Sequence, residues 1–262
     1  LIMTDIIRRL GYKTLIIVTR LELLNQLKII TFCGNYGDPI INDNLIDMCR
    51  YAAQINPKIE IGIHTNGSAR NTDWWMELAR ALPTNHHAFI SIDGLEDTNH
   101  LYRVGADYNK IIENSKAFIS EGGNAFWTFL KFKHNEHQIE EARQRAKEIG
   151  FSSFVLKTTY RYLNTPYYKV VDKDDNILYY LEPPTDNNNA YVSKSFIDNF
   201  ETYVGSAKIS CQSLKEKEIF IDCEKKVFPC CYYAYVPMSY IQGDDNVKKL
   251  REKGNKQVYE FI

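Results

Sequence analysis

The segment KIITFCGNYGDP, residues 28–39, contains the pattern from which the fold can be predicted. Its first part, Lys28–Phe32, is a short β-branched run that is typical of a buried strand. The loop that follows contains two glycines, which let the backbone turn sharply and approach a ligand closely. Asp38 offers a carboxylate for an ammonium group, and Pro39 stiffens the exit of the loop. A strand that ends in such a loop is typical of parallel α/β proteins, whose ligands bind at the strand ends.

A strand-then-helix rhythm continues from this segment as far as residue 160. Further strands are expected at Ile59–His64, Ala88–Ile92, Phe126–Phe132 and Ser153–Leu156. Helices are expected at Asn42–Ile55, at Thr72–Leu82 with Thr72 as the N-cap, at Tyr108–Ser120 and at Glu136–Ile149. Alternating units of about thirty residues predict parallel strands joined by right-handed helical crossovers. We therefore expect an α/β fold, a partial (β/α) TIM-like barrel with fewer than the eight units of a closed one.

The rhythm breaks after Tyr160, and the pattern changes to hairpins and linkers. A first hairpin is expected from Tyr167–Val171 and Ile177–Leu181, and a second from Ile219–Asp222 and Lys226–Phe228. The chain is therefore divided into a partial barrel over residues 1–160, a hairpin and linker over 161–205, and a small α+β domain over 206–262.

Composition excludes several classes of protein. The 262 residues include 32 basic and 33 acidic side chains, and a net charge of −1 argues against a nucleic-acid clamp that works by bulk electrostatics. Hydrophobic residues make up 44%, which is sufficient for a core of useful size. No apolar run reaches the roughly 18 residues of a membrane helix, and no secretory signal is recognisable. We expect a cytoplasmic protein with neither nucleic acid nor membrane as a partner.

The cysteines are unevenly distributed. Cys49 falls on the buried stripe of a helical pattern and is expected to be a core thiol. A late group consists of Cys211, Cys223, Cys230 and Cys231. Structural disulfides are rare in a reducing cytosol, so this late group indicates a metal or cluster site. Four thiolates could hold a [4Fe–4S] cluster; zinc is a rival, although the paired knuckles of a zinc ribbon are lacking, and a site without metal is the third alternative.

Polar residues also follow the next strands. The second strand ends in Thr65-Asn66-Gly67, and the third in Ser91-Ile92-Asp93-Gly94. Ser91 and Asp93 alternate with isoleucines, so both are expected on one face, where an inward hydroxyl and carboxylate need partners. The two hydroxyls of a ribose would satisfy them. The alternative is ordinary turn chemistry, in which Gly, Asn and Asp are common.

These motifs resemble those of the radical S-adenosylmethionine (SAM) enzymes, in particular members with a twitch or SPASM-type auxiliary cluster domain. The resemblance covers residues from about Lys28 to about Tyr232. It implies that Asp38 replaces the glutamate of the family's Gly-Gly-Glu-Pro loop, which binds the SAM amino group. It further implies that Ser91 and Asp93 contact the ribose and that Arg103 lies near the SAM carboxylate. The implied SAM-binding set is Tyr36, Gly37, Asp38, Pro39, Thr65, Asn66, Ser91, Asp93, Arg103 and Asn135.

The C-terminal cysteines carry a second part of the resemblance. The segment VFPCC, residues 227–231, is similar to the family's Val-x-Pro-Cys-Cys. The spacing of Cys211 and Cys230 also fits the family pattern, except that Lys225 stands where a glycine is usual. The resemblance implies an auxiliary [4Fe–4S] cluster held by Cys211, Cys223, Cys230 and Cys231.

One family motif is absent from the sequence. The catalytic [4Fe–4S] cluster of the family sits on a CxxxCxxC loop after the first barrel strand, and no such spacing exists here. We expect the first strand and this loop to precede Leu1, so that the ligands of the catalytic cluster lie outside this chain. True loss of the cluster is the alternative.

The resemblance implies a specific reaction. A reduced cluster, fed by a low-potential electron donor, would cleave SAM to a 5′-deoxyadenosyl radical that abstracts hydrogen from a peptide or small-molecule substrate. The present chain alone would be inactive, and its sequence identifies no catalytic side chain. One alternative is a TIM-like hydrolase or lyase that uses Asp38, Asp93 and His64 at the barrel mouth. The other is a degenerate barrel with a metal-containing annex that binds without turnover.

Overall fold

The computed structural model describes residues 2–4, 23–34, 37–159, 162, 167–172, 176–186, 202, 210–221 and 227–228. Most of its strands form one sheet of eight strands in the order β10-β9-β1-β2-β3-β4-β5-β6. The parallel part consists of β1 Ile2–Thr4, β2 Ile29–Cys33, β3 Glu60–Thr65, β4 His86–Ser91, β5 Ala125–Leu130 and β6 Ser153–Lys157. The edge hairpin consists of β9 Phe220–Ile221 and β10 Val227–Phe228, which are antiparallel. The carboxyl ends of β1 to β6 therefore lie at one edge of the sheet.

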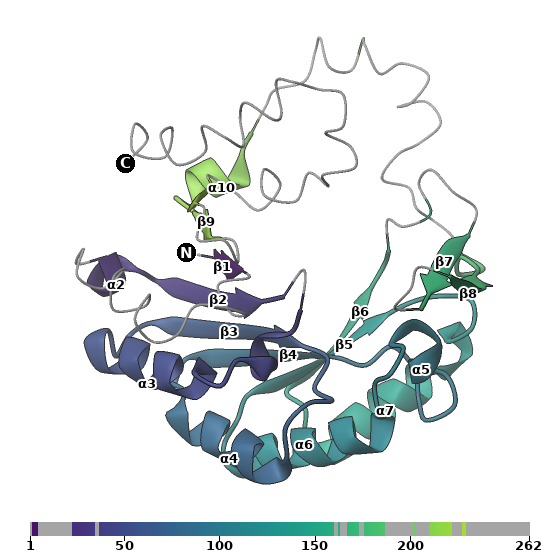
Figure 1. Cartoon of the computed structure of the whole chain (residues 1–262), viewed down its shortest axis with the longest axis horizontal. Helices are drawn as coiled ribbons and strands as arrows, with labels where there is room; N and C mark the ends of the chain where they lie inside the picture. Colours follow the sequence, from purple (N-terminus) through teal and green to yellow (C-terminus); the bar gives the residue numbers. More distant parts are fainter. Residues whose placement is uncertain are drawn as a thin grey trace.

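The long helices lie together on one side of this sheet (Figure 1). They are α3 Leu45–Ile55, α4 Thr72–Ala81, α6 Tyr108–Ser120 and α7 Ile139–Ile149. Short helical turns are α2 Leu23–Gln26, η1 Pro39–Ile41, α5 Asn99–Tyr102, η2 Glu136–Gln138 and α10 Gln212–Lys215. No helix in the described part of the chain has the length and apolar character needed to cross a membrane.

The core lies between the sheet and the long helices. Alternate strand residues such as Ile63, Ile90 and Trp127 are fully buried and pack with Trp75 and Phe118 from the helices. Side chains alternate between the two faces of a strand, so the intervening residues point to the face without the long helices. That second face carries half-buried residues and leads up to the polar strand ends.

The predicted βα rhythm is confirmed from β2 to β6. The helix α6 has the predicted bounds, and α7 ends at Ile149, directly before the predicted Gly150, whose φ of 102° is left-handed. The predicted N-cap of α4 is wrong by one residue: Asn71, not Thr72, accepts a hydrogen bond from the Trp74 N–H, at 3.0 Å. An asparagine side chain reaches the third helical N–H as well as a threonine does, and sequence alone does not separate the two.

The sheet differs from expectation at its β2 edge. The strand before β2 is expected to be missing, but β1 pairs with β2 in parallel, from Ile2 opposite Thr31 to Thr4 opposite Cys33. The second hairpin does not stand apart either, because β9 pairs with β1 through Ile2 and Phe220. Pairing satisfies backbone groups that an open edge would leave exposed. No pairing between β6 and β10 closes the sheet within the described residues, and the division into domains stays a prediction.

The first hairpin, β7 Tyr168–Val171 and β8 Ile177–Leu181, is confirmed and forms its own antiparallel pair. It packs against the segments that follow β4 and β5 through a second hydrophobic cluster of Phe132, Tyr162, Val170 and Leu181. The Tyr179 hydroxyl donates to the Leu101 carbonyl at 2.9 Å, and Lys131 and Lys133 pair with Asp186 and Glu182. These contacts fix the hairpin beside the carboxyl ends of the strands.

Candidate functional site

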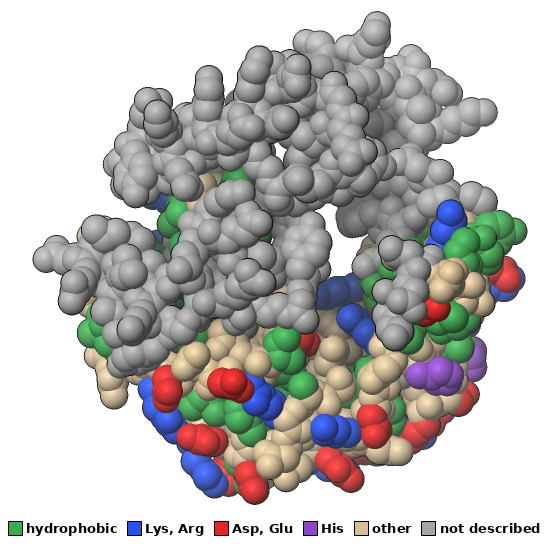
Figure 2. Space-filling view, in the orientation of Figure 1, with side chains coloured by type: hydrophobic (Ala, Val, Ile, Leu, Met, Phe, Trp, Pro, Cys, Tyr) green, Lys and Arg blue, Asp and Glu red, His purple; other side chains and the backbone are tan. Residues whose placement is uncertain are grey.

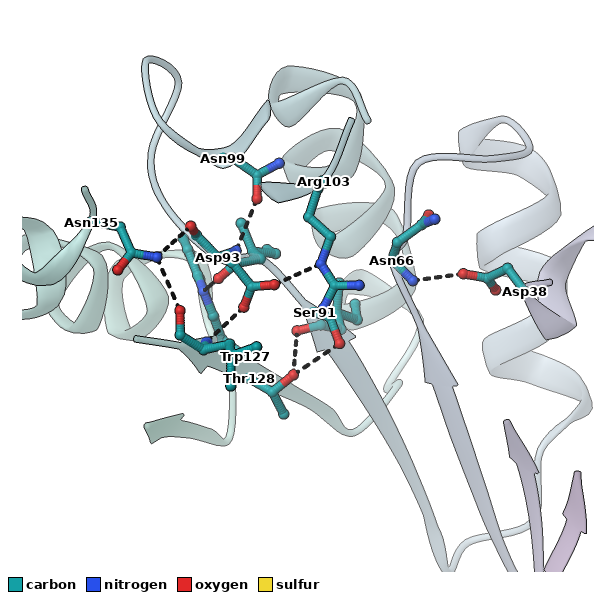
Figure 3. A network of polar contacts seen from close by, with 12 residues as sticks. Asp38, Asn66, Ser91, Asp93, Asn99, Arg103, Trp127, Thr128 and Asn135 are labelled. Carbon is teal, nitrogen blue, oxygen red and sulfur yellow. Dashed lines mark hydrogen bonds and ion pairs between the residues drawn. The ribbon is translucent and has the colours of Figure 1, made fainter. Parts of the chain in front are cut away.

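Asp38 braces two loops at the carboxyl end of the sheet (Figure 3). One carboxylate oxygen accepts a hydrogen bond from the Ile40 N–H at 3.2 Å and caps η1, and the other accepts one from the Asn66 N–H at 2.7 Å. Burial raises the pKa of Asp38, and the Asn66 N–H opposes that rise. The Asp38 carboxylate, which was expected to bind an ammonium group, therefore links the loop after β2 to the loop after β3.

Asp93 occupies the centre of the polar network at the end of β4 (Figure 3). Its side chain is completely buried, and one oxygen pairs with Nε of Arg103 at 2.6 Å. The other oxygen accepts a hydrogen bond from the Leu130 N–H at 2.6 Å. A buried carboxylate needs such partners, so the expected ribose hydroxyls are not required to satisfy its charge. Asp93 instead orients Arg103 and ties β4 to β5.

Asn135 connects the same two strand ends from the other side. Its side-chain amide donates to the carbonyls of Asp93 and Leu130 at 2.8 and 3.0 Å, and its oxygen accepts from the Phe132 N–H at 2.7 Å. The residue is fully buried. Asn99 completes the turn, since its oxygen accepts from the Asp93 N–H at 2.8 Å. Asn135 therefore fixes the shape of the loops. The sequence did not indicate Asn99, because its partner is a backbone group.

The remaining predicted residues lie at the same carboxyl ends of the strands, which we call the rim. The Ser91 hydroxyl is hydrogen-bonded to the Thr128 hydroxyl at 3.1 Å, in register on the neighbouring strand β5. Thr128 is not among the residues predicted from the sequence; the alternation within β5 is the signal that could have indicated it.

The loop after β3 is held by its own side chains. Thr65 accepts from the Gly67 N–H at 3.0 Å, and the Asn66 side chain accepts from the Ser68 N–H at 2.9 Å. Gly37 and Pro39 flank Asp38, whereas Tyr36 lies outside the described residues.

A cavity of about 400 Å³ opens beside Arg103. It is lined by Asn66, Ser68, residues 102–106 and the β7 residues Tyr168 to Val171. Arg103 and Lys169 bring positive charge to this wall, and no acidic side chain lines it among the described residues. Lys and Arg side chains also border the hollow near the centre of Figure 2. The guanidinium of Arg103 lies 5.1 Å from the Tyr102 ring centre, which adds to its fixed position. The cavity therefore favours a ligand with a carboxylate or another anionic group.

His64 lies on the face of β3 that the long helices do not cover. Its ring stacks on Phe89, with 4.5 Å between ring centres and an angle of 11°. Burial, together with the positive charge of Lys157 on β6, lowers the pKa of His64 to about 4. Burial likewise lowers the pKa of Lys157. His64 is therefore neutral near pH 7 and contributes an apolar, stacked ring to the interior.

This burial predicts an acid-sensitive stability. The folded pKa of His64, about 4, is below its ordinary value of 6.5, so the unfolded chain takes up the proton first as the pH falls. Stability is expected to decrease between pH 6.5 and 4, by up to about 3 kcal/mol for this residue. His64→Phe keeps the stacked ring and should flatten the profile of urea midpoints measured from pH 7 to 4. Parallel profiles for the two proteins would contradict the assignment.

The cysteines are only partly placed. Cys49 is fully buried in α3, as predicted for a core thiol, and burial raises its pKa. Cys211 is exposed just before α10, while Cys223, Cys230 and Cys231 lie outside the described residues. In the part of the chain that the structure describes, no three His, Cys, Asp or Glu side chains form a group that could hold a metal ion. The described residues thus do not fit a catalytic cluster, and the auxiliary cluster stays a prediction.

Neither a family model nor a curated protein matches the sequence. Solved structures do share its fold. SuiB from Streptococcus suis, bound to its precursor peptide SuiA, has a TM-score of 0.53 at 16% identity, over 83% of this chain and 52% of that chain. The anSMEcpe structure with bound AdoMet (SAM) and the Cp18Cys peptide has a TM-score of 0.55 at 15% identity, over 100% and 82%. The chain spans about half the length of the SuiB chain that it matches. Its α/β sheet and helices therefore have the fold of SuiB and anSMEcpe.

Proposed function

We propose that this chain forms the SAM-binding part of a radical SAM enzyme that acts on a peptide or a small molecule. One observation carries the proposal. Arg103 is fixed by the buried Asp93 at the rim of a cavity of about 400 Å³, at the carboxyl ends of parallel strands. The fold that surrounds this rim is shared with anSMEcpe structures that contain AdoMet and a peptide.

The residues at the rim suit the parts of SAM. Arg103 uses Nε for Asp93, and a guanidinium has further donors with which to bind the methionyl carboxylate. Asn66 and Ser68 offer polar groups on the same cavity wall. We assign Ser91, whose hydroxyl is hydrogen-bonded to that of Thr128, to the ribose hydroxyls, while Asp38 and Asn135 keep the loops in shape. Pre-positioned groups of this kind lose little conformational freedom when a ligand binds.

SAM with a reduced [4Fe–4S] cluster would supply a 5′-deoxyadenosyl radical for removal of hydrogen from the substrate. The part assigned to this chain's own residues is to bind SAM, to orient it and to exclude water. No thiolate ligands of the catalytic cluster are assigned to the described residues. We further propose that Cys211, Cys223, Cys230 and Cys231 hold an auxiliary [4Fe–4S] cluster, and that a low-potential electron donor is a partner.

The hydrolase alternative has weaker support. General acid–base chemistry needs titratable groups that reach a substrate. The Asp93 carboxylate is fully buried against Arg103 and the Leu130 N–H. Asp38 is occupied by the N–H groups of Ile40 and Asn66, and the His64 ring is stacked on Phe89. These groups support the loops and the interior rather than a reactive carboxylate pair.

The test is reductive cleavage of SAM. The gene product that contains this chain is reconstituted anaerobically with iron and sulfide, its iron content is measured, and SAM is added with dithionite. The proposal predicts formation of 5′-deoxyadenosine that depends on the loaded cluster. Absence of the product from a protein with a full complement of iron would contradict the proposal and favour a binding module without turnover.

A further inference from the structure

Arg70 has a backbone conformation that residues other than glycine rarely adopt. It ends the loop between β3 and α4, directly before the α4 cap Asn71, and its φ is 68°. This left-handed region is costly for a residue with a Cβ, because the Cβ then crowds the backbone carbonyl oxygen. Strained residues persist where surrounding contacts hold them, and they cluster at functional sites. The contacts of the Arg70 side chain therefore show what holds the loop in this conformation.

The Arg70 side chain reaches η1, in the loop after β2. Its Nε donates a hydrogen bond to the carbonyl of Ile40 at 2.7 Å, and Ile40 is completely buried. A terminal guanidinium nitrogen pairs with Asp43 at 2.7 Å, and the guanidinium lies 5.5 Å from the centre of the Trp74 ring. The Asp43 side chain is 86% exposed, so this ion pair contributes little. The charge-assisted bond to the Ile40 carbonyl is therefore the main link from Arg70 to η1.

A second link joins the same two loops at the other end of the segment. The Asn66 N–H donates to the Asp38 carboxylate, which also caps η1. The segment of residues 66–70 is thus attached to η1 at both of its ends. The Asn114 side chain of α6 also donates to the Gly67 carbonyl, at 2.9 Å. One support of the segment is therefore independent of η1, and the segment should stay folded when its link through the guanidinium is removed.

The 66–70 segment brings polar groups to the cavity beside Arg103. Asn66 and Ser68 line this cavity, whereas Arg70 is not among its lining residues. The side-chain oxygen of Asn66 accepts hydrogen bonds from the Ser68 N–H and hydroxyl, at 2.9 and 2.8 Å. Its amide nitrogen has no acceptor among the described residues and is left for a ligand. An amide held through its oxygen presents its N–H donors in a fixed direction, so a shift of the segment relative to η1 would move them.

We infer that Arg70 is a positioning residue for the cavity. By holding the 66–70 segment on η1, it fixes Asn66 and Ser68 in the places from which they contact the ligand. The inference rests on the proposed function, which identifies that ligand as SAM. Groups that are already in place lose little conformational freedom when a ligand binds, so the Arg70 contact contributes to SAM affinity although Arg70 itself lies outside the cavity wall.

Two substitutions separate positioning from simple support of the fold. Arg70→Gly removes the bond to Ile40 and also the backbone strain, since glycine adopts a positive φ freely. Arg70→Met removes the bond but keeps the strain, so it should be the less stable of the two in urea unfolding. Both should weaken SAM binding by about tenfold in calorimetric titration of the reconstituted gene product, because both lose the same bond. Asp43→Ala breaks only the exposed ion pair and should leave the affinity unchanged. Wild-type affinity for SAM in both Arg70 variants would overturn the inference.

Hydrogen exchange tests the placement of the segment without a ligand. The amides of Asn66 and Ser68 are hydrogen-bonded to side chains of the two loops, and both should exchange about tenfold faster in Arg70→Gly and Arg70→Met. The amide of Ile63, within β3, should exchange as in wild type. Unchanged exchange at Asn66 and Ser68 would overturn the inference. Wild-type protein that binds no SAM would contradict the proposed function alone, since the exchange rates still decide whether Arg70 holds the segment.

Discussion

Asp93→Ala is expected to reduce the free energy of unfolding by about 3 kcal/mol, the lower end of the cost of breaking a buried ion pair, because Asp93 is completely buried whereas Arg103 is partly exposed. The substitution leaves Arg103 without its carboxylate and the Leu130 N–H without its acceptor. It also loosens the tie between the ends of β4 and β5. Urea unfolding followed by tryptophan fluorescence measures the effect, because Trp127 donates to the Ile92 carbonyl next to the site, at 2.9 Å.

Two further variants separate the explanations for this loss. Glu96→Ala breaks a surface ion pair with Arg145 and should cost less than about 1 kcal/mol. Adding Arg103→Met to Asp93→Ala removes the uncompensated charge, so the double variant should recover part of the stability. A cost for Asp93→Ala no larger than that for Glu96→Ala would show that Asp93 does not hold the strand ends together.

Gly94→Ala is expected to be similarly severe, with a loss of about 3 kcal/mol or more from strain and steric overlap. Gly94 has a φ of 151°, and a Cβ there would lie 2.2 Å from the Thr98 hydroxyl and 2.7 Å from the Asn99 backbone nitrogen. The turn that carries Asp93 would have to shift. We therefore expect loss of stability together with loss of the Asp93–Arg103 arrangement.

Gly105→Ala is the matched control for Gly94→Ala. Gly105 also has a positive φ, of 80°, but no atom of the described residues lies within 4 Å of the position that an alanine methyl group would take there. Its substitution should cost only the backbone strain of about 1–2 kcal/mol. Equal losses at the two positions in urea unfolding would mean that close packing against Thr98 and Asn99 is unimportant.

The parallel βα core could be predicted because local periodicity encodes it. The run from Ile59 to His64 is rich in isoleucine, as a buried strand is, and the structure has β3 there. The residues from Tyr108 to Ser120 have apolar side chains at helical spacing, and α6 has these bounds. The hairpin of β9 and β10 at the edge of the sheet was predicted as well, but its pairing with β1 could not be. The strands β1 and β9 are three and two residues long, and their pairing joins Ile2 to Phe220, far apart in the sequence.

The candidate site was predictable in position but not in detail. Glycine, asparagine and aspartate after successive strands indicated the rim, and the structure places Asp38, Asn66, Ser91 and Asp93 along it. Their partners are largely backbone N–H groups, such as those of Asn66 and Leu130. Every residue except proline has such a group, so the amino-acid sequence does not show which one will be a partner. The buried Asn135 shows the same limit, since its role depends on three backbone groups brought together only by the fold.

The central claim is that the rim around Arg103 binds the methionyl carboxylate of SAM, and a calorimetric titration tests it most directly. The reconstituted gene product is titrated with SAM and with decarboxylated SAM, as wild type, as Arg103→Met and as the control Arg143→Met on the exposed side of α7. We predict that Arg103→Met weakens SAM at least tenfold, leaves decarboxylated SAM unchanged, and that Arg143→Met changes neither. Wild-type protein that binds SAM no better than Arg103→Met does would contradict the account.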